Sequence, residues 1–397
     1  MSETFIVSQI ELAINAGYEV TLLVKNYKEE NTGFYAETFK KYNLAHCVLR
    51  EDYKIPSQRH MRILTWFKLL FQNLNTLFYV LRFYKDKKKF PLSYLYQFNF
   101  YKQFQNTELI HIQYGTNKAP LDILKKIGFL KSKIIVSFHG HDAFFPINGF
   151  IQQKGYYDYL FEVADLIHVN TPYLEQQLIK IGADRVKILD LPVSVDTEFF
   201  RPEKKKNTSS LLRLLTVGRL DEVKGHRFAI EIVSLLREQG VEVVLNIIGE
   251  GDQRQYLENL IDQKSLKDQV FLYGRKNAYE LRRFYNNHDI LLFTSVALPG
   301  GRKETQGLVL GEAQACGLPV VAFDSGGVKY TFKDGFSGFL CEEGNVHEMK
   351  NKILELNENP KLRQVMGTNA VNFVKNYNAR EHVGLLWSEI YRNLQLT

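Results

Sequence analysis

Cysteine is scarce in this chain of 397 residues, and its three cysteines, Cys47, Cys316 and Cys341, have neither paired nor metal-ligand spacing. This excludes a disulfide framework or a zinc module and suits a reducing compartment. No apolar run reaches the roughly 18 residues of a membrane-spanning helix, and no N-terminal stretch has the pattern of a secretory signal. We therefore expect a cytoplasmic protein, soluble or peripheral on the inner face of the cytoplasmic membrane.

Other motifs are also missing. No G-x-G-x-x-G follows a predicted strand with an acidic residue about 20 positions later, which argues against a dinucleotide oxidoreductase. No groove-reading motif or stacking platform is visible, so no nucleic-acid partner is expected. What the chain does have is a globular composition with 45% apolar residues, a formal net charge of +7 and a pI near 9.0. The charge suits an anionic partner, and the length favours two domains.

Apolar runs of strand type alternate with helical periodicity along most of the chain, which predicts an α/β fold of two Rossmann-like, doubly wound domains that face a central cleft. A helix is expected at residues 5–17, with a C-cap at Gly17. The chain opens without the strand that should precede this helix, so we expect a truncated or mis-assigned start. A segment near Pro192, rich in proline and then in lysine and serine, is expected to link the domains. The expected strands are residues 18–24, 109–112, 133–138, 166–170, 211–217, 242–248, 269–272, 290–293 and 320–323.

Residues 304–327 carry the strongest functional pattern. Glu304 is expected just before a helix, Gly307 and Leu308 at its first turn, and Glu312 one turn later. The free N–H groups and positive dipole end of that turn favour a phosphate, and Gly307 lets the backbone come close to it. The two carboxylates can accept hydroxyls of a sugar and a ribose. An ordinary surface helix with acidic residues near its start is the alternative.

A second phosphate pattern follows the strand at 211–217. The loop after it contains Gly218, Arg219 and Lys224 and leads into a helix, a layout that can hold a pyrophosphate with point charges. The next two predicted strands, 242–248 and 269–272, are followed by Gly249 and by Gly274 and Arg275. Residues that can contact a ligand therefore follow several strands at the carboxyl edge of this sheet.

In the first half, the predicted strand at 133–138 ends in Phe138, His139, Gly140, His141 and Asp142. Polar groups at the carboxyl end of a buried strand favour a substrate contact. A local hydrogen-bonding role and a metal site are the alternatives.

Residues 50–104 are basic and aromatic. One alternative is a helix that packs its apolar face on the sheet, with the lysine run at 85–89 in a solvated loop. The other is an interfacial helix that holds the protein on an anionic membrane. The apolar residues at helical spacing are Ile63, Trp66, Phe67, Leu70, Leu74, Leu77, Phe78 and Leu81.

The second half resembles the retaining glycosyltransferases of family 4, which have the GT-B architecture. The resemblance covers nearly all of residues 211–345, and the segments at 2–6 and 138–142 are similar to a subgroup that builds capsular, exopolysaccharide or lipopolysaccharide chains. It implies an acceptor-binding domain at 1–195, a donor-binding domain at 196–377 and a helix at 378–397 that crosses back to the first domain. The residues that carry it are Gly218, Arg219, Lys224, Gly225, Gly249, Gly251, Gly274, Arg275, Glu304, Glu312, Ala313, Gly317, Pro319, Ser325, Gly326 and Gly327.

The resemblance also implies roles. Arg219 and Lys224 would bind the donor diphosphate, Glu304 the donor sugar, Glu312 the ribose, and the backbone at Gly307 and Leu308 a phosphate. Arg275 would lie near the base, and His139 would face the transferred sugar.

The implied activity is transfer of a sugar, without a metal or other cofactor, from a nucleoside diphosphate sugar to a glycan acceptor, and we expect this acceptor to be lipid-linked. A UDP-sugar is favoured over a GDP-sugar. Two departures from the family pattern affect this expectation: Lys329 and Tyr330 replace a common Pro-Glu, and Thr305 and Gln306 indicate a different sugar pocket. An accessory subunit without turnover and a sugar-nucleotide epimerase remain as alternatives.

Overall fold

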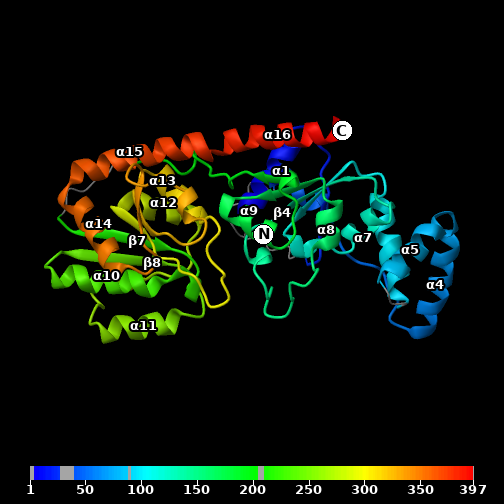
Figure 1. Ribbon diagram of the computed structural model, residues 1–397, viewed down its shortest axis with the longest axis horizontal. Helices are drawn as coiled ribbons and strands as arrows, with labels where there is room; N and C mark the ends of the chain where they lie inside the picture. Colours follow the sequence, from blue (N-terminus) through cyan, green and yellow to red (C-terminus); the bar gives the residue numbers. More distant parts are fainter. Residues whose placement is uncertain (1–3, 27–39, 88–90, 204–209, 397) are drawn as a thin grey trace. The chain divides into compact units, whose positions relative to one another are not determined.

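The computed structural model describes residues 4–26, 40–87, 91–203 and 210–396 (Figure 1). The chain divides into two units. Unit 1 comprises Met1–Ser8, Asn170–Gln177 and Asp190–Leu386, and unit 2 comprises Gln9–Val169, Leu178–Leu189 and Trp387–Thr397. Each unit is an α/β structure built on parallel strands, which agrees with the expected GT-B fold class.

Unit 1 contains a six-stranded sheet in the order β12-β11-β10-β7-β8-β9. All neighbouring strands are parallel. Strands β8 and β9 extend the sheet on one side of β7, and β10, β11 and β12 extend it on the other, which is the doubly wound order with its switch point between β7 and β10. The strands are β7 Leu212–Val217, β8 Val243–Ile248, β9 Val270–Leu272, β10 Ile290–Phe293, β11 Val320–Phe323 and β12 Gly338–Cys341.

Both faces of this sheet are buried because β10 and β11 are apolar at every position and β7 and β8 at most of theirs. Leu214 and Leu292 pack on one face, and their chain neighbours Leu215 and Phe293 pack on the other. Successive side chains of a strand point to opposite faces, so continuous apolar runs are what a sheet covered on both sides requires. The runs identified in the sequence are therefore confirmed as strands, with bounds that differ by one residue at most within this sheet.

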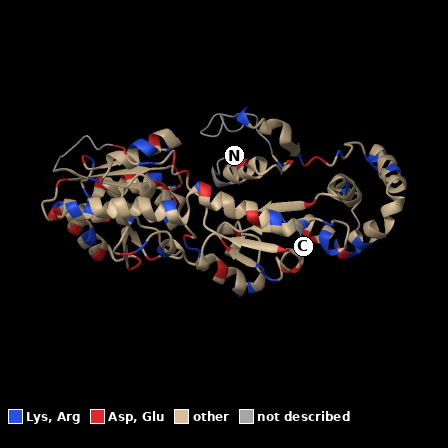
Figure 2. Ribbon diagram, turned by 90° about the horizontal axis from the view of Figure 1, so that it is seen from above, with Lys and Arg blue, Asp and Glu red and all other residues tan. Residues whose placement is uncertain are grey.

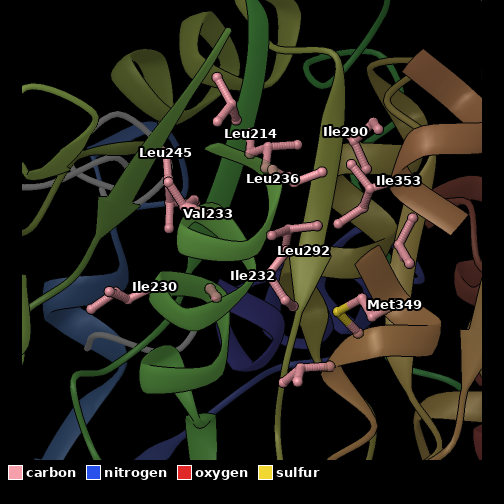
Figure 3. Close-up of a cluster of buried hydrophobic side chains, with 14 of the residues drawn as sticks. Leu214, Ile230, Ile232, Val233, Leu236, Leu245, Ile290, Leu292, Met349 and Ile353 are labelled. Carbon is pink, nitrogen blue, oxygen red and sulfur yellow. The ribbon is translucent and has the colours of Figure 1, made fainter. Parts of the chain in front are cut away.

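Helices α10, α11 and α14 cover the first face. Figure 3 shows Leu214, Leu245 and Leu292 of the strands in contact with Val233 of α10 and Met349 of α14 in one cluster. The bounds are α10 His226–Glu238, α11 Arg254–Gln263 and α14 Val346–Glu358.

Helices α12, α13 and α15 cover the other face (Figure 1). Helices α13 and α15 come very close, because a Cβ on Gly367 would lie 2.4 Å from the backbone oxygen of Gly317. Gly317 has φ of 76° and ends α13, as the sequence predicted. The bounds are α12 Ala278–Asn287, α13 Leu308–Ala315 and α15 Pro360–Tyr377.

The segment expected as a linker is largely packed at residues 191–200 and exposed at residues 201–203. Val193 and Val195 are buried, and Val195 pairs with Ala379 in a parallel bridge. The amide N–H of Val195 donates to the carbonyl of Asn378, and that of Arg380 donates to the carbonyl of Val195. Residues 193–195 and 378–380 therefore run side by side in unit 1. Residues 204–209 of the expected linker lie outside the described residues.

Unit 2 contains two separate sheets in its described residues: β1-β2, which is parallel, and β3-β4-β5-β6, in which β3, β4 and β5 are parallel. Its strands are β1 Leu22–Val24, β2 Val48–Arg50, β3 Leu109–Gln113, β4 Lys133–Ser137, β5 Leu166–Val169 and β6 Ile188–Asp190. The remaining described helices, of which α1, α9 and α16 have residues in both units, are α1 Thr4–Asn15, α3 Leu44–Cys47, α4 Arg59–Gln72, α5 Leu77–Lys87, α6 Ser93–Tyr101, α7 Leu121–Lys126, α8 Asp158–Val163, α9 Pro172–Lys180 and α16 Arg380–Leu396.

The helix expected at 5–17 is present as α1, which ends at Asn15, and Gly17 has φ of 90° two residues after that end. The strand expected at 18–24 is shorter than predicted, since only Leu22–Val24 pairs with a neighbour. The prediction is therefore wrong for residues 18–21. Alternation of apolar residues along one segment cannot show how far the neighbouring strand extends.

The apolar row of residues 63–81 forms two helices rather than one. Helix α4 ends before Asn73, a short 3-10 turn follows at Leu74–Thr76, and α5 continues the chain. Packing of the row on the sheet, one of the two alternatives, is wrong for several members, because Ile63, Phe67, Leu74, Phe78 and Leu81 are exposed. The lysine run at 85–89 is helical to Lys87, and residues 88–90 lie outside the description. Within the described residues, no helix has the length and apolarity needed to cross a membrane.

The second half of α16 completes the core of unit 2. Trp387 is 2% exposed, and its ring centroid lies 5.1 Å from that of His111 on β3 and 4.8 Å from that of His168 on β5. The hydroxyl of Tyr391, one turn later, is 2.9 Å from Nδ1 of His111. These contacts bury two imidazoles beside an aromatic layer, and burial lowers the pKa of His111 to about 3.

Replacing Trp387 with alanine should therefore destabilise the protein by about 3–5 kcal/mol, because it removes a buried indole and leaves a cavity that the neighbouring strands cannot close. Urea unfolding followed by circular dichroism measures the change. Leu385→Ala is the matched control on the same helix, since Leu385 is 69% exposed and should change stability little. Equal midpoints for the two variants would contradict the packing role of Trp387.

Candidate active site

Three glycine turns meet at the carboxyl ends of β7, β8 and β9. The amide of Gly218 donates to the carbonyl of Ile248, and that of Gly249 donates to the carbonyl of Gly274, both at 3.0 Å. A Cβ on Gly249, whose φ is 152°, would lie 1.8 Å from the oxygen of Gly218. Side chains are therefore excluded where these turns cross, which leaves backbone as the surface there.

Lys224 is held between the loops that follow β7 and β10. Its amide donates to Oδ1 of Asp221, and the hydroxyl of Thr294 donates to its carbonyl at 3.3 Å. The next residue, Gly225, has φ of 60°, and a Cβ there would lie 2.1 Å from the oxygen of Thr294. The turn thus brings Lys224 to the switch point of the sheet, where ligands of doubly wound folds bind.

Lys224 and Glu304 form an ion pair between Nζ and Oε2, with side chains that are only 17% and 14% exposed. Burial by itself would raise the pKa of Glu304, but the Lys224 ammonium and the backbone N–H groups of Thr305 and Gln306 outweigh it and hold that pKa below its ordinary value. Glu304 is therefore a carboxylate at neutral pH, and a cation and an anion stand together at this point of unit 1.

The backbone around Glu304 is fixed by the turn after β11. The amide of Gly327 donates to the carbonyl of Glu304 at 2.9 Å, and a Cβ on Gly327 would lie 1.8 Å from the oxygen of Thr305. The side chain of Thr171 donates to that same oxygen at 2.8 Å. Gln306 is 4% exposed and accepts the amide of Val193 at 3.2 Å, so its side chain supports the backbone.

Helix α13 begins directly after Gly307, whose φ is 80°. A Cβ on Gly307 would lie 2.8 Å from the ring of Phe293, so glycine fits here for both conformation and space. Leu308 is the first helical residue, and the first-turn N–H groups lack acceptors within the helix. An anion would be favoured at this end, as the sequence indicated.

Glu312 lies one turn into α13 and accepts a hydrogen bond of 2.8 Å from the hydroxyl of Tyr285. Burial raises the pKa of Glu312 to about 6, and the Tyr285 hydrogen bond opposes part of that shift. The carboxylate is therefore present at neutral pH at some cost to stability.

Arg219 and Arg275 are exposed residues that directly follow two of the glycine turns, at Gly218 and Gly274. The Arg219 side chain is 69% exposed, with one Nη2 to Oδ2 contact of 3.3 Å to Asp221. Arg275 follows β9 and the Gly274 turn. An exposed ion pair is weak, so little free energy holds the Arg219 guanidinium in place when an anion approaches.

Unit 2 contains the remaining candidate, His139. Its Nε2 lies 2.9 Å from Oε1 of Gln113, and its ring packs edge-on against Tyr114 with centroids 4.7 Å apart. Burial, and next the neighbouring imidazoles of His168 and His111, put its pKa well below the ordinary value. His139 is therefore a neutral imidazole at the carboxyl end of β4.

Asp142 holds the backbone of that loop. Its carboxylate accepts the amides of Gly115, His139 and Gly140 at 2.9, 3.1 and 3.0 Å. A local hydrogen-bonding role was one of the alternatives for residues 138–142, and Asp142 has this role. In the described ranges, no three His, Cys, Asp or Glu side chains gather in a way that could hold a metal ion.

The structure thus brings Gly218, Lys224, Gly249, Glu304 and Gly307 together in unit 1, through close packing at the glycines and the Lys224–Glu304 ion pair. Their roles toward a ligand, and those of Arg219, Arg275, Leu308, Glu312 and His139, remain predictions. Sequence reasoning missed Tyr285, which binds Glu312, and Glu343, which accepts the amide of Ala297 at 2.6 Å and pairs with Lys303 at 3.0 Å. No spacing signal points to these partners, because they come from other elements of the fold.

Known glycosyltransferases are similar to this chain in sequence and in fold. Residues 196–373 match the family model described as glycosyl transferases group 1. That part of the chain is a group 1 glycosyltransferase domain, and the protein is a transferase of the glycosyltransferase class.

Two curated relatives extend the likeness over most of the chain. The amylovoran biosynthesis glycosyltransferase AmsK of Erwinia amylovora is 29% identical over 364 residues, which cover 90% of this chain and 88% of that protein. The putative colanic acid biosynthesis glycosyltransferase WcaL of Escherichia coli K12 is 28% identical over 358 residues, covering 89% and 86%.

Solved structures support the fold. HepE of Anabaena in complex with UDP has a TM-score of 0.69 at 16% identity and covers 98% of this chain and 96% of that one. Sucrose-phosphate synthase of Thermosynechococcus elongatus has a TM-score of 0.72 at 19% identity, covering 98% and 92%.

Glu312 gives a testable pH effect. Its pKa is raised in the folded state from 4.5 to about 6, so the stabilising contribution is present below pH 4.5 and is lost as the pH rises through 6. Glu312→Gln removes the buried charge and should be more stable than the wild type by about 2 kcal/mol at pH 8, with the difference vanishing near pH 4.5. Urea unfolding at several pH values measures it.

Glu358→Gln, at an exposed position of α14, serves as the control and should follow the wild-type profile. A constant difference between Glu312→Gln and wild type at all pH values would show that the charge of Glu312 is not the cause.

Proposed function

We propose that the protein transfers a sugar, with retention of anomeric configuration, from a nucleoside diphosphate sugar to a lipid-linked glycan in exopolysaccharide synthesis. The names of AmsK and WcaL support the pathway. The partly buried Lys224–Glu304 pair beside the glycine turns and the start of α13 carries the proposal.

The donor diphosphate would be held by cations and backbone. Lys224 would bind it from one loop, Arg219 from the same turn, and the N–H groups at Gly307 and Leu308 from the helix end. Negative charge develops on the diphosphate as the sugar leaves, and preorganised donors aimed at that charge lower the barrier. These groups would stabilise the leaving diphosphate without a metal or another cofactor.

The two carboxylates would select the remaining parts of the donor. Glu304 would accept hydroxyls of the sugar, and Glu312 those of the ribose, with Arg275 near the base. Each carboxylate has a fixed partner in the protein, Lys224 or Tyr285, that orients it. His139 would contact the transferred sugar as a neutral hydrogen-bonding group.

Variants of the ion pair separate transfer from nucleotide binding. Lys224→Ala should lower kcat about a hundredfold to a thousandfold, since one preorganised donor contributes that much, and should weaken UDP binding. Glu304→Ala should abolish transfer yet bind UDP at least as tightly as wild type, because UDP has no sugar and Lys224 loses its competing anion. Calorimetry with UDP, GDP, ADP and CMP, together with a transfer assay from the matching sugar nucleotides, measures both effects.

Lys352→Ala and Glu355→Ala are the matched controls, because these residues form a 3.0 Å ion pair on α14 away from the glycine turns. Both variants should have the kcat and the UDP affinity of the wild type. Wild-type turnover by Glu304→Ala would refute the assignment of the site, and no heat of binding with any of the four nucleotides would refute the donor class.

A further inference from the structure

Helices α4 and α5 form a helical hairpin in unit 2, residues 59–87, that the proposed reaction does not use (Figure 1). The chain reverses at Asn73 and the 3-10 turn, and Nε1 of Trp66 donates to the hydroxyl of Tyr84 at 3.4 Å across the two helices. The inner side of the hairpin is anchored by buried Leu69, Val80 and Phe83.

The outer face of the hairpin is apolar and exposed. Its residues recur three or four positions apart, so on each helix they share the side opposite the buried anchors. Large side chains that are more than half exposed rarely gather in one place on a soluble protein unless they meet a partner. These residues are Leu64 at 63%, Phe67 at 51%, Phe71 at 69%, Leu74 at 55%, Phe78 at 64% and Leu81 at 59% exposure.

Cations are interleaved with these apolar side chains. Between residues 59 and 87 the chain has six Lys and Arg residues and a single acid, Asp86. Lys68, Arg82 and Lys85 are exposed, and the guanidinium of Arg82 lies 5.3 Å from the ring centroid of Phe78. Figure 2 shows the blue lysine and arginine bands along the hairpin at the right-hand edge.

We propose that the outer face of the α4–α5 hairpin docks on the surface of an anionic lipid bilayer. The phenyl and leucyl side chains would enter the boundary between headgroups and acyl chains, while the long lysine and arginine side chains reach the phosphates. One signal alone gives only marginal, reversible membrane binding, and apolar area together with basic charge would supply the two signals that stable attachment takes.

Charge favours this occupant over a second copy of the chain. Two copies joined through this face would bring their cations together, whereas anionic lipid supplies the opposite charge. The proposal rests on unit 2 alone and is independent of the donor site, so Lys224→Ala should leave membrane binding unchanged.

Co-sedimentation of the full chain with phosphatidylglycerol or phosphatidylcholine vesicles tests the proposal. The wild type should bind phosphatidylglycerol at least tenfold more tightly, and binding should weaken as salt rises toward about 1 M. Phe71→Ser should lose about tenfold in partitioning, and the double variant Arg82→Gln with Lys85→Gln about tenfold or more.

Matched controls come from exposed residues elsewhere. Phe150→Ser changes the same residue type at 71% exposure in unit 2, and Lys180→Gln with Lys375→Gln removes two exposed cations on other helices. Both should sediment as wild type, and a thermal melt of every variant checks that folding is retained.

Equal binding to both lipids, or a Phe71→Ser variant that binds as wild type, would overturn the proposal. It would also be overturned if the wild type ignored vesicles and eluted as a dimer that Phe71→Ser makes monomeric, since the face would then join two copies.

Discussion

A charge that is largely withdrawn from water is costly unless an opposite charge pairs with it, and in unit 1 Lys224 and Glu304 pair with each other. The two residues come from loops 80 positions apart in the chain. Lys224 is set by the turn after β7, and Glu304 by backbone contacts with the turn after β11. Leaving either charge alone in a partly dry site would be costly, so the pair constrains both loops while holding two groups ready for a polar ligand.

Glycine makes this arrangement possible because backbone must touch backbone at several crossings. Gly249 lies against Gly218, Gly225 against Thr294, and Gly327 against Thr305, each too close for a Cβ. The loops therefore depend on the absence of side chains where they cross, and the charged side chains lie between those crossings. Polar and backbone groups gather at the carboxyl edge of the sheet, where the doubly wound order opens its switch point.

Unit 2 follows a different physical logic. Its interior is aromatic and holds the neutral imidazole of His111 beside Trp387, whereas the α4–α5 hairpin presents aromatic and basic side chains outward. Packing against the sheet accounts for the aromatic and imidazole side chains of the interior. It does not account for the aromatic and basic side chains that the hairpin exposes. A sugar transferase that acts on a lipid-linked acceptor would gain from such a face, since attachment to the bilayer turns a search in three dimensions into one in two.

The sequence by itself determined the α/β class, the central strands of unit 1, and the glycine and carboxylate positions of the candidate site, because apolar runs and turn residues act locally. Only the tertiary structure decided which groups meet. Tyr285 reaches Glu312, Gln306 binds Val193, and the row at residues 63–81 breaks into two helices whose outer face is exposed. These pairings depend on contacts between residues far apart in the chain, and periodicity within a segment shows which residues share a face but not what covers that face.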